Sequence, residues 1–211
     1  MKKILLITVG VIVFVGTYYA SSFLPFNKAK GFSPHITDNS EIQRLQSFAA
    51  EAKLFTANKG YNSSFCFLLD MWLPSAQNRF FVYDLKNDRV LYAGLVAHGS
   101  CNTSFLVKAQ FNNQPGCGCS AKGKYKVGYK YAGRFGTAYK LYGLDSTNSN
   151  AYDRYIVLHS YSLVPDKETA PLPICNSLGC AMVSPNFIKQ LAVNIDASKK
   201  PVLLWMLEKG E

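Results

Sequence analysis

The sequence predicts a mainly β domain that contains a few helices. Apolar, strand-like runs recur from residue 65 to residue 207, whereas only two segments place apolar residues at helical spacing. The chain has 211 residues, of which 48% are hydrophobic, so it is long enough for one domain with a substantial core. Because strands outnumber helices, we expect mixed β-sheet in a curved or sandwiched arrangement.

Two segments are predicted to be helices. The first covers residues 41–57, carries apolar residues three and four positions apart, and ends at Gly60. The second begins at Ser184, a residue type that caps helices, followed by Pro185, which is favoured in the first helical turn. Its core-facing residues are Phe187, Ile188, Leu191 and Ile195.

Seven apolar runs are predicted to be strands: residues 65–72, 79–85, 89–97, 124–131, 137–144, 154–159 and 202–207. The second and third runs are separated by Lys86-Asn87-Asp88, which predicts a hairpin. Residues 98–123 are rich in Gly, Asn, Ser and Cys and show no period. A long irregular segment of this kind indicates a functional or disulfide-tethered loop.

The N-terminus has the pattern of an export signal. Lys2-Lys3 precede an apolar run over residues 4–20, and small residues follow it. The run is also long enough to span a bilayer, which takes about 17–25 residues. We therefore expect residues 1–24 to be a signal peptide or an N-terminal membrane anchor, with both alternatives open. Either one places the remainder of the chain in the periplasm or cell envelope, and a retained anchor would hold it to the inner membrane.

The rest of the chain is divided into a linker with the first helix, residues 25–60, and a main domain, residues 61–211. The formal net charge of +10 fits either scattered surface lysines or an acidic partner. Nucleic acid is not expected as a partner, because no basic stripe or nucleic-acid-binding motif is present. We expect a monomer.

Cys180 and His159 are the candidate catalytic pair. A cysteine attacks carbonyl groups as a thiolate, and a nearby histidine is the usual means of forming one near neutral pH. Gly179 allows a sharp turn before Cys180, and the amides of these two residues could bind an oxyanion. The alternatives are an inert buried cysteine or a disulfide between Cys180 and Cys175.

Two histidines follow predicted strands. As a base, His159 would need its second ring nitrogen oriented, and the carbonyl of Ser160 could accept its proton. A satisfied structural histidine is the alternative. His98, in His98-Gly99-Ser100, is expected to line the same cleft, or else to hold the end of the sheet by hydrogen bonding.

The six cysteines also allow disulfides in an exported protein. Cys101, Cys117 and Cys119 lie in the long loop with His98 and raise the alternative of a zinc site. Their Cys-x-Cys spacing does not match the usual zinc patterns, so we favour disulfide tethering and expect no metal and no cofactor. The pairing itself is not given by the sequence.

The ordered motifs resemble the murein L,D-transpeptidase catalytic domain family, in its divergent Ser-x-Gly-Cys branch, over about residues 65–207. The strongest are Arg154-Tyr155-Ile156-Val157-Leu158-His159 and Ser177-Leu178-Gly179-Cys180. They are preceded by His98-Gly99-Ser100, Tyr131-Ala132-Gly133-Arg134-Phe135-Gly136, Leu141-Tyr142-Gly143-Leu144 and Asn148-Ser149-Asn150-Ala151.

The resemblance implies a β-sandwich of mixed sheets that acts on peptidoglycan stem peptides. In such an enzyme the Cys180 thiolate attacks an amide at the third residue of the donor stem, D-alanine leaves, and an acyl-enzyme forms. The side-chain amine of an acceptor stem then resolves it as a 3–3 cross-link, and carbapenems acylate the same cysteine. By position, His159 is the base, Gly179, Ser160 and Ser177 are oxyanion or orienting residues, and His98, Tyr131 and Arg154 belong to the cleft.

Two positions depart from the family pattern. Leu178 replaces the usual histidine before Gly-Cys, and Met182 replaces a common arginine. Two alternatives to transpeptidation stay open: hydrolysis of the same acyl-enzyme by an L,D-carboxypeptidase or amidase, since the shape of the cleft selects the acceptor, and an inactive wall-binding module.

Overall fold

The computed structural model describes residues 39–208. The predicted export segment 1–24, its apolar run 4–20 and most of the linker from residue 25 lie outside the described residues. Within residues 39–208, no helix is both long and apolar enough to cross a membrane.

Eight strands form one mixed sheet in the order β3-β2-β1-β8-β4-β5-β6-β7. The pairs β1·β8 and β6·β7 are parallel, and all other neighbours are antiparallel. The prediction of a mainly β fold with mixed sheet and few helices is thereby confirmed. The strands are β1 (Phe65–Asp70), β2 (Phe80–Asp84), β3 (Arg89–Gly94), β4 (Gly123–Gly133), β5 (Gly136–Gly143), β6 (Val157–Ser160), β7 (Ala181–Val183) and β8 (Val202–Leu207).

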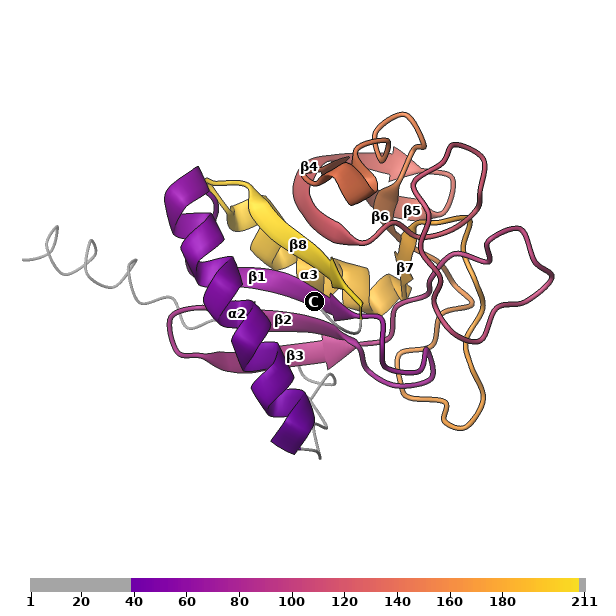
Figure 1. Ribbon diagram of the computed structural model, residues 1–211, viewed down its shortest axis with the longest axis horizontal. Helices are drawn as coiled ribbons and strands as arrows, with labels where there is room; N and C mark the ends of the chain where they lie inside the picture. Colours follow the sequence, from indigo (N-terminus) through magenta and orange to yellow (C-terminus); the bar gives the residue numbers. More distant parts are fainter. Residues whose placement is uncertain (1–38, 209–211) are drawn as a thin grey trace, which may run out of the picture.

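The first predicted helix is present as α2 (Asn39–Lys59), and it covers the outer face of β1, β2, β3 and β8 (Figure 1). Its buried side chains Leu45 and Phe48 pack there, and the Phe48 ring meets the edge of Trp205 at 5.3 Å between centroids. Gly60 follows with φ +72°, a conformation that glycine adopts without steric cost and that ends the helix.

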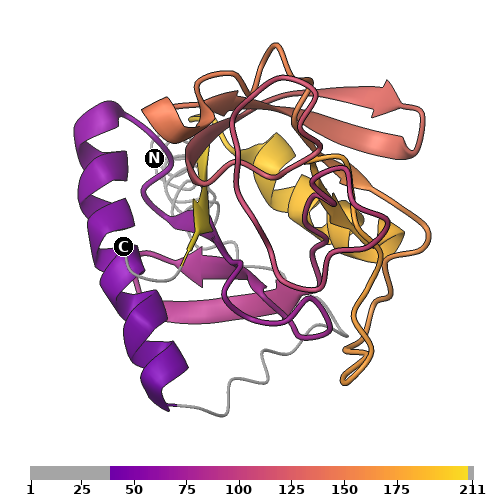
Figure 2. The same cartoon turned by 45° about the vertical axis from the view of Figure 1, so that its right-hand side comes forward.

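The second helix, α3 (Pro185–Ala197), lies within the curve of the sheet. Ser184 caps it as predicted, since its Oγ accepts the Phe187 N–H at 3.0 Å. The Phe187 ring then packs edge-on against Phe80 at 5.3 Å. One core cluster joins α3 to residues of all eight strands. Figure 2 shows the two halves of the sheet on either side of this helix, which gives the domain its sandwich-like section.

Several strand boundaries differ from the sequence-based prediction, and two short elements are additional; the run 89–97, for example, is a strand only as far as Gly94. The strand expected over residues 154–159 begins only at Val157, because Tyr155 adopts φ +57° in a preceding turn. The run 65–72 leaves the sheet after Asp70, whose carboxylate accepts the Trp72 N–H in a turn. The three-residue strand β7 and a short 3₁₀ helix (Ser146–Asn148) were not predicted.

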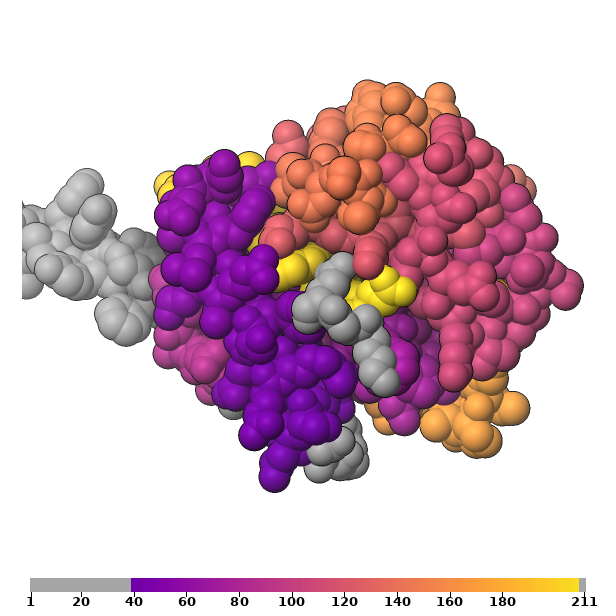
Figure 3. Space-filling view, in the orientation of Figure 1, coloured from indigo at the N-terminus to yellow at the C-terminus, as the bar shows by residue number. Residues whose placement is uncertain are grey.

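The loop over residues 98–123 is tethered as predicted, by a disulfide between Cys101 and Cys119. It is also joined to the segment before Cys180: the Ser177 N–H donates to the His98 carbonyl at 2.8 Å, and the Ser100 N–H donates to the Ser177 carbonyl at 2.9 Å. In the space-filling view this loop covers much of the side of the domain away from α2 (Figure 3). It therefore supports the turn that carries Cys180.

Candidate active site

The register of β6 and β7 places Cys180 and His159 on the same face of the sheet. Leu158 pairs with Ala181, and both side chains belong to the central core. Because side chains alternate along a strand, His159 and its partner Met182 point to the opposite face. Cys180, directly before β7, packs with Met182 and lines the same cavity as His159. Parallel neighbouring strands thus bring together two side chains that are 21 residues apart in the sequence.

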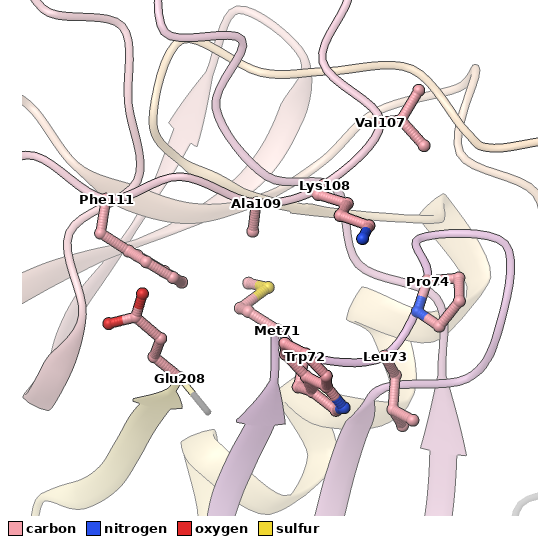
Figure 4. Close-up of a pocket in the computed structure, with 9 residues that line it drawn as sticks. All are labelled: Met71, Trp72, Leu73, Pro74, Val107, Lys108, Ala109, Phe111 and Glu208. Atoms are coloured by element: carbon pink, nitrogen blue, oxygen red, sulfur yellow. The ribbon is translucent and has the colours of Figure 1, made fainter. Parts of the chain in front are cut away.

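Both side chains line one open cavity of about 610 Å³. Its wall combines the long loop, the tip of the β4–β5 hairpin and the segment before β7. The lining residues are Ser100, Thr103, Ser104, Phe105, Phe135, His159, Tyr161, Cys175, Asn176, Ser177, Leu178, Cys180 and Met182. A separate cavity of about 460 Å³ lies where β1 and β8 end, between Met71, Phe111 and Glu208 (Figure 4). Among residues 39–208, no cysteine, histidine or serine lines this second cavity, so we assign the candidate active site to the first one.

His159 is held in one orientation. Its Nδ1 lies 2.9 Å from the Ser160 carbonyl oxygen, which is the contact expected from the sequence. A carbonyl can only accept a hydrogen bond, so Nδ1 carries the proton and Nε2 is left as the basic nitrogen. Burial lowers the pKa of His159, and the bond to Ser160 opposes this effect in part. The imidazole is therefore neutral at neutral pH.

The tip of the β4–β5 hairpin covers His159. The Phe135 ring stacks on the imidazole with 5.7 Å between centroids and 24° between planes, and Tyr161 meets Phe135 edge-on at 5.1 Å. The Ser160 hydroxyl donates to the Phe135 carbonyl and fixes the tip. Sequence reasoning missed Phe135, although an aromatic residue between Gly133 and Gly136 in a hairpin was a usable signal.

The Cys180 side chain is half-buried and faces the open cavity. Its sulfur lies 3.7 Å from the Tyr155 carbonyl oxygen. Burial raises the pKa of Cys180, whereas the Val157 amide and the positive charges of Lys140 and Arg154 lower it. Because burial dominates, the thiol is protonated at neutral pH and needs a base before it can attack. Lys140 was not singled out from the sequence, because it reads as an ordinary strand lysine.

The turn before Cys180 depends on Gly179 and Ser177. Gly179 has φ +113°, and a Cβ there would lie 2.6 Å from the Cys119 carbonyl oxygen. Ser177 Oγ accepts the Gly179 N–H at 3.0 Å and donates to the Cys180 carbonyl at 2.8 Å. Ser177 therefore holds the turn. The Gly179 amide is already engaged, so of the two amides expected to bind an oxyanion it is the Cys180 amide that stays a candidate.

Arg154 and Tyr131 lie beside Cys180 and are not part of the cavity wall. Arg154 donates to the Asn112 carbonyl at 2.9 Å, to Cys117 Sγ at 3.2 Å and to the Cys119 carbonyl, so it ties the long loop beneath the turn. Tyr131 is close enough that Cys180 contributes, after burial, to raising the pKa of its hydroxyl. Both residues shape the surroundings of the thiol.

His98 does not line the cleft, which corrects the first expectation for this residue. Its side chain is fully buried, with Nδ1 2.8 Å from Arg79 Nη2 and Nε2 3.1 Å from the Leu106 carbonyl oxygen. Burial and the charge of Arg79 lower the pKa of His98 to about 4, so it stays neutral. It holds the end of the sheet, as the alternative expectation stated.

The cysteines divide into one disulfide and four free thiols. Besides Cys180, the free thiols are Cys66, Cys117 and Cys175, of which Cys175 lines the same cavity as Cys180. No disulfide links Cys175 to Cys180 in this structure. In the part of the chain from residue 39 to residue 208, no group of three or more His, Cys, Asp or Glu side chains is placed to hold a metal ion.

Comparison with known proteins gives one family. A sequence profile described as L,D-transpeptidase catalytic domain matches residues 38–204. The helical cell shape determining protein Pgp2 from Campylobacter jejuni is similar in structure at 15% identity and a TM-score of 0.44, over 70% of this chain and 49% of that one. An L,D-transpeptidase from Mycobacterium smegmatis is similar in structure at 14% identity and a TM-score of 0.41, over 69% of this chain and 59% of that one. The chain thus spans about half the length of the Campylobacter protein, and no curated protein matches it significantly.

Proposed function

The chain belongs to the L,D-transpeptidase catalytic domain family, and from this premise we propose that it is an exported acyltransferase that acts on peptidoglycan stem peptides through a Cys180 acyl-enzyme. The observation that carries the proposal is that His159 on β6 and Cys180, directly before the parallel strand β7, line the same open cavity.

In the first half-reaction, Nε2 of His159 removes the thiol proton as Cys180 Sγ attacks the donor amide carbonyl. The Ser160 carbonyl keeps Nδ1 protonated and stabilises the imidazolium that forms. The developing oxyanion is bound by the Cys180 amide. The tetrahedral intermediate then expels the amine, which takes its proton from His159, and a thioester with Cys180 is left.

In the second half-reaction, an acceptor amine loses a proton to His159 and attacks the thioester. The amide forms, and Cys180 leaves as a thiolate that regains the proton. Transpeptidation and hydrolysis differ only in whether an amine or water is the acceptor. We keep transpeptidation as the principal proposal because it is the activity that the family description names.

The cellular setting is part of the proposal. We propose that residues 1–24 direct export, that a retained segment 4–20 would anchor the domain to the inner membrane, and that the domain acts in the periplasm or cell envelope as a monomer. Its substrates and products there are donor and acceptor stem peptides.

The test uses purified tetrapeptide muropeptides with wild type, Cys180→Ser and His159→Ala. We expect wild type to release D-alanine and form 3–3 dimers, and both variants to lose at least about a hundredfold in rate, as is usual when a catalytic base or nucleophile is removed. Release of D-alanine without dimers would assign hydrolysis. A variant that keeps wild-type turnover, with unchanged thermal unfolding, would refute the assignment of that residue.

A further inference from the structure

We propose that Lys140 is a positioning residue of the active site, whose ammonium group stabilises the Cys180 thiolate without contacting the substrate. Lys140 lies on β5, is only 5% exposed, and takes no part in the proposed proton transfers. It is not among the residues that line the cavity of Cys180. The inference rests on the proposed role of Cys180 as the nucleophile and adds the charge that stabilises its reactive form.

The Lys140 ammonium group is buried without a bonded carboxylate. Its Nζ donates to the Tyr152 carbonyl oxygen at 2.8 Å and lies 4.4 Å from the centroid of the Tyr152 ring and 5.1 Å from that of Tyr155. Ring faces attract cations, so both contacts favour the charged form. Within residues 39–208 no ion pair includes Lys140, and Asp153 acts on it only from further away. Its positive charge is therefore available to another anionic group nearby.

The tyrosine rings that hold Lys140 are themselves held. Tyr142 stacks on Tyr152 with 5.4 Å between centroids and 19° between planes, and Lys126 Nζ lies 4.4 Å from the centroid of Tyr142 on its own account. Tyr155 adopts φ +57°, a left-handed conformation that is strained for a residue with a Cβ. Lysines and tyrosines thus alternate in one ladder: Lys126, Tyr142, Tyr152, Lys140 and Tyr155.

Two backbone contacts connect the ladder to the thiol. The Tyr155 carbonyl oxygen lies 3.7 Å from Cys180 Sγ, and the amide of Val157, the strand partner of Lys140, donates to the same sulfur. A thiol can donate to the Tyr155 carbonyl, but that oxygen would repel a thiolate. The positive charge of Lys140 beside Tyr155 offsets this repulsion once the proton has left. In agreement, burial lowers the pKa of Lys140, whereas the charge of Cys180 raises it.

The remaining titratable groups that act on the thiol or share its cavity are His159, Arg154, Tyr125 and Tyr131. The two tyrosines are neutral near pH 7, because burial raises the pKa of their hydroxyls. Arg154 donates to three acceptors of the long loop. His159 becomes positive only after it has taken the thiol proton. Lys140 keeps its own protons throughout, so its charge is present before the sulfur becomes negative.

The test measures the thiolate of Cys180 in the full chain, through its rate of alkylation by iodoacetamide as a function of pH. Only the thiolate reacts, and peptide mass spectrometry separates Cys180 from the other cysteines. In Lys140→Met we expect the rate at pH 7 to fall about tenfold, because the profile moves to higher pH when a nearby positive charge is lost. Lys140→Arg should restore the rate. Lys126→Met, in the same ladder, is the matched control and should leave the profile in place.

A second uncharged variant separates loss of charge from loss of structure. Lys140→Gln keeps a donor for the Tyr152 carbonyl, so it should shift the profile as Lys140→Met does, and it carries the test if Lys140→Met does not fold. A profile that stays in place in the uncharged variants, an equal shift in Lys126→Met, or no rescue by Lys140→Arg would overturn the inference.

Alkylation needs neither a base nor peptidoglycan, so this test is independent of the proposed function. The tenfold difference should persist between His159→Ala and His159→Ala/Lys140→Met, and its loss there would overturn the direct action of Lys140 on the thiolate. Absence of muropeptide turnover by wild type, with the alkylation results as expected, would overturn the proposed function alone.

Discussion

Gly179→Ala is the substitution that tests most sharply how the fold positions Cys180. Gly179 has φ +113°, and an added Cβ would lie 2.6 Å from the Cys119 carbonyl oxygen and 3.0 Å from Ile156 Cδ1. An L-residue with a Cβ is strained by about 1–2 kcal/mol at positive φ. Displacing the Cys119 carbonyl, which accepts from Arg154, adds about 1 kcal/mol. We therefore expect Gly179→Ala to lower the free energy of unfolding by roughly 2–3 kcal/mol.

Gly116→Ala provides the matched control in the long loop. Gly116 also has positive φ, +75°, but a Cβ there would have no heavy atom within 4 Å. Gly116→Ala should therefore lower the free energy of unfolding only by the backbone strain, about 1–2 kcal/mol, and leave the Cys180 turn in place.

The assay combines urea unfolding with the rate of Cys180 acylation by a carbapenem, followed by intact-protein mass spectrometry. We expect Gly179→Ala to be acylated at least about tenfold more slowly than Gly116→Ala, because the nucleophile moves relative to His159. Equal stability and equal acylation rates for the two variants would refute the reasoning that close packing at Gly179 sets the position of the thiol.

Three further predictions concern the residues around the thiol. Because burial lowers the pKa of His159, the acid limb of the pH profile for acylation should lie below pH 6.5; a limb above that value would contradict a neutral buried base. Phe135→Ala exposes the imidazole, so the acid limb of the pH profile, measured by stopped flow, should move up towards pH 6.5. If the limb does not move, Phe135 does not shield His159. Ser177→Ala loses two hydrogen bonds, to Gly179 and Cys180, and should lower the urea-unfolding free energy by about 1–3 kcal/mol; a change under about 0.5 kcal/mol would show that the hydroxyl does not hold the turn.

The elements that the sequence predicts well are those with a complete local signal. Helix α3 has a capping Ser184, a proline in its first turn and a helical apolar period, and the structure contains all three features. Strand β8 is a continuous apolar run and is fully buried. By contrast, β7 has only three residues, which is too short for a period, and it is a strand only because β6 lies beside it.

The site was predictable where chemistry is tied to a motif and unpredictable where it depends on distant contacts. The bond from His159 to the neighbouring Ser160 carbonyl is local and was expected. His98 was expected first in the cleft, but Arg79, 19 residues away, and Leu106 bury it, and a single sequence gives no sign of that contact.

The central claim is that Cys180 is a nucleophile activated by its surroundings. The most direct test is intact-protein mass spectrometry of the reduced domain after incubation with a carbapenem, with wild type, Cys180→Ser and Cys175→Ser in parallel. The account predicts a single adduct on wild type and on Cys175→Ser, and none on Cys180→Ser. An equal adduct on Cys180→Ser, an adduct lost with Cys175, or no adduct on wild type would contradict it.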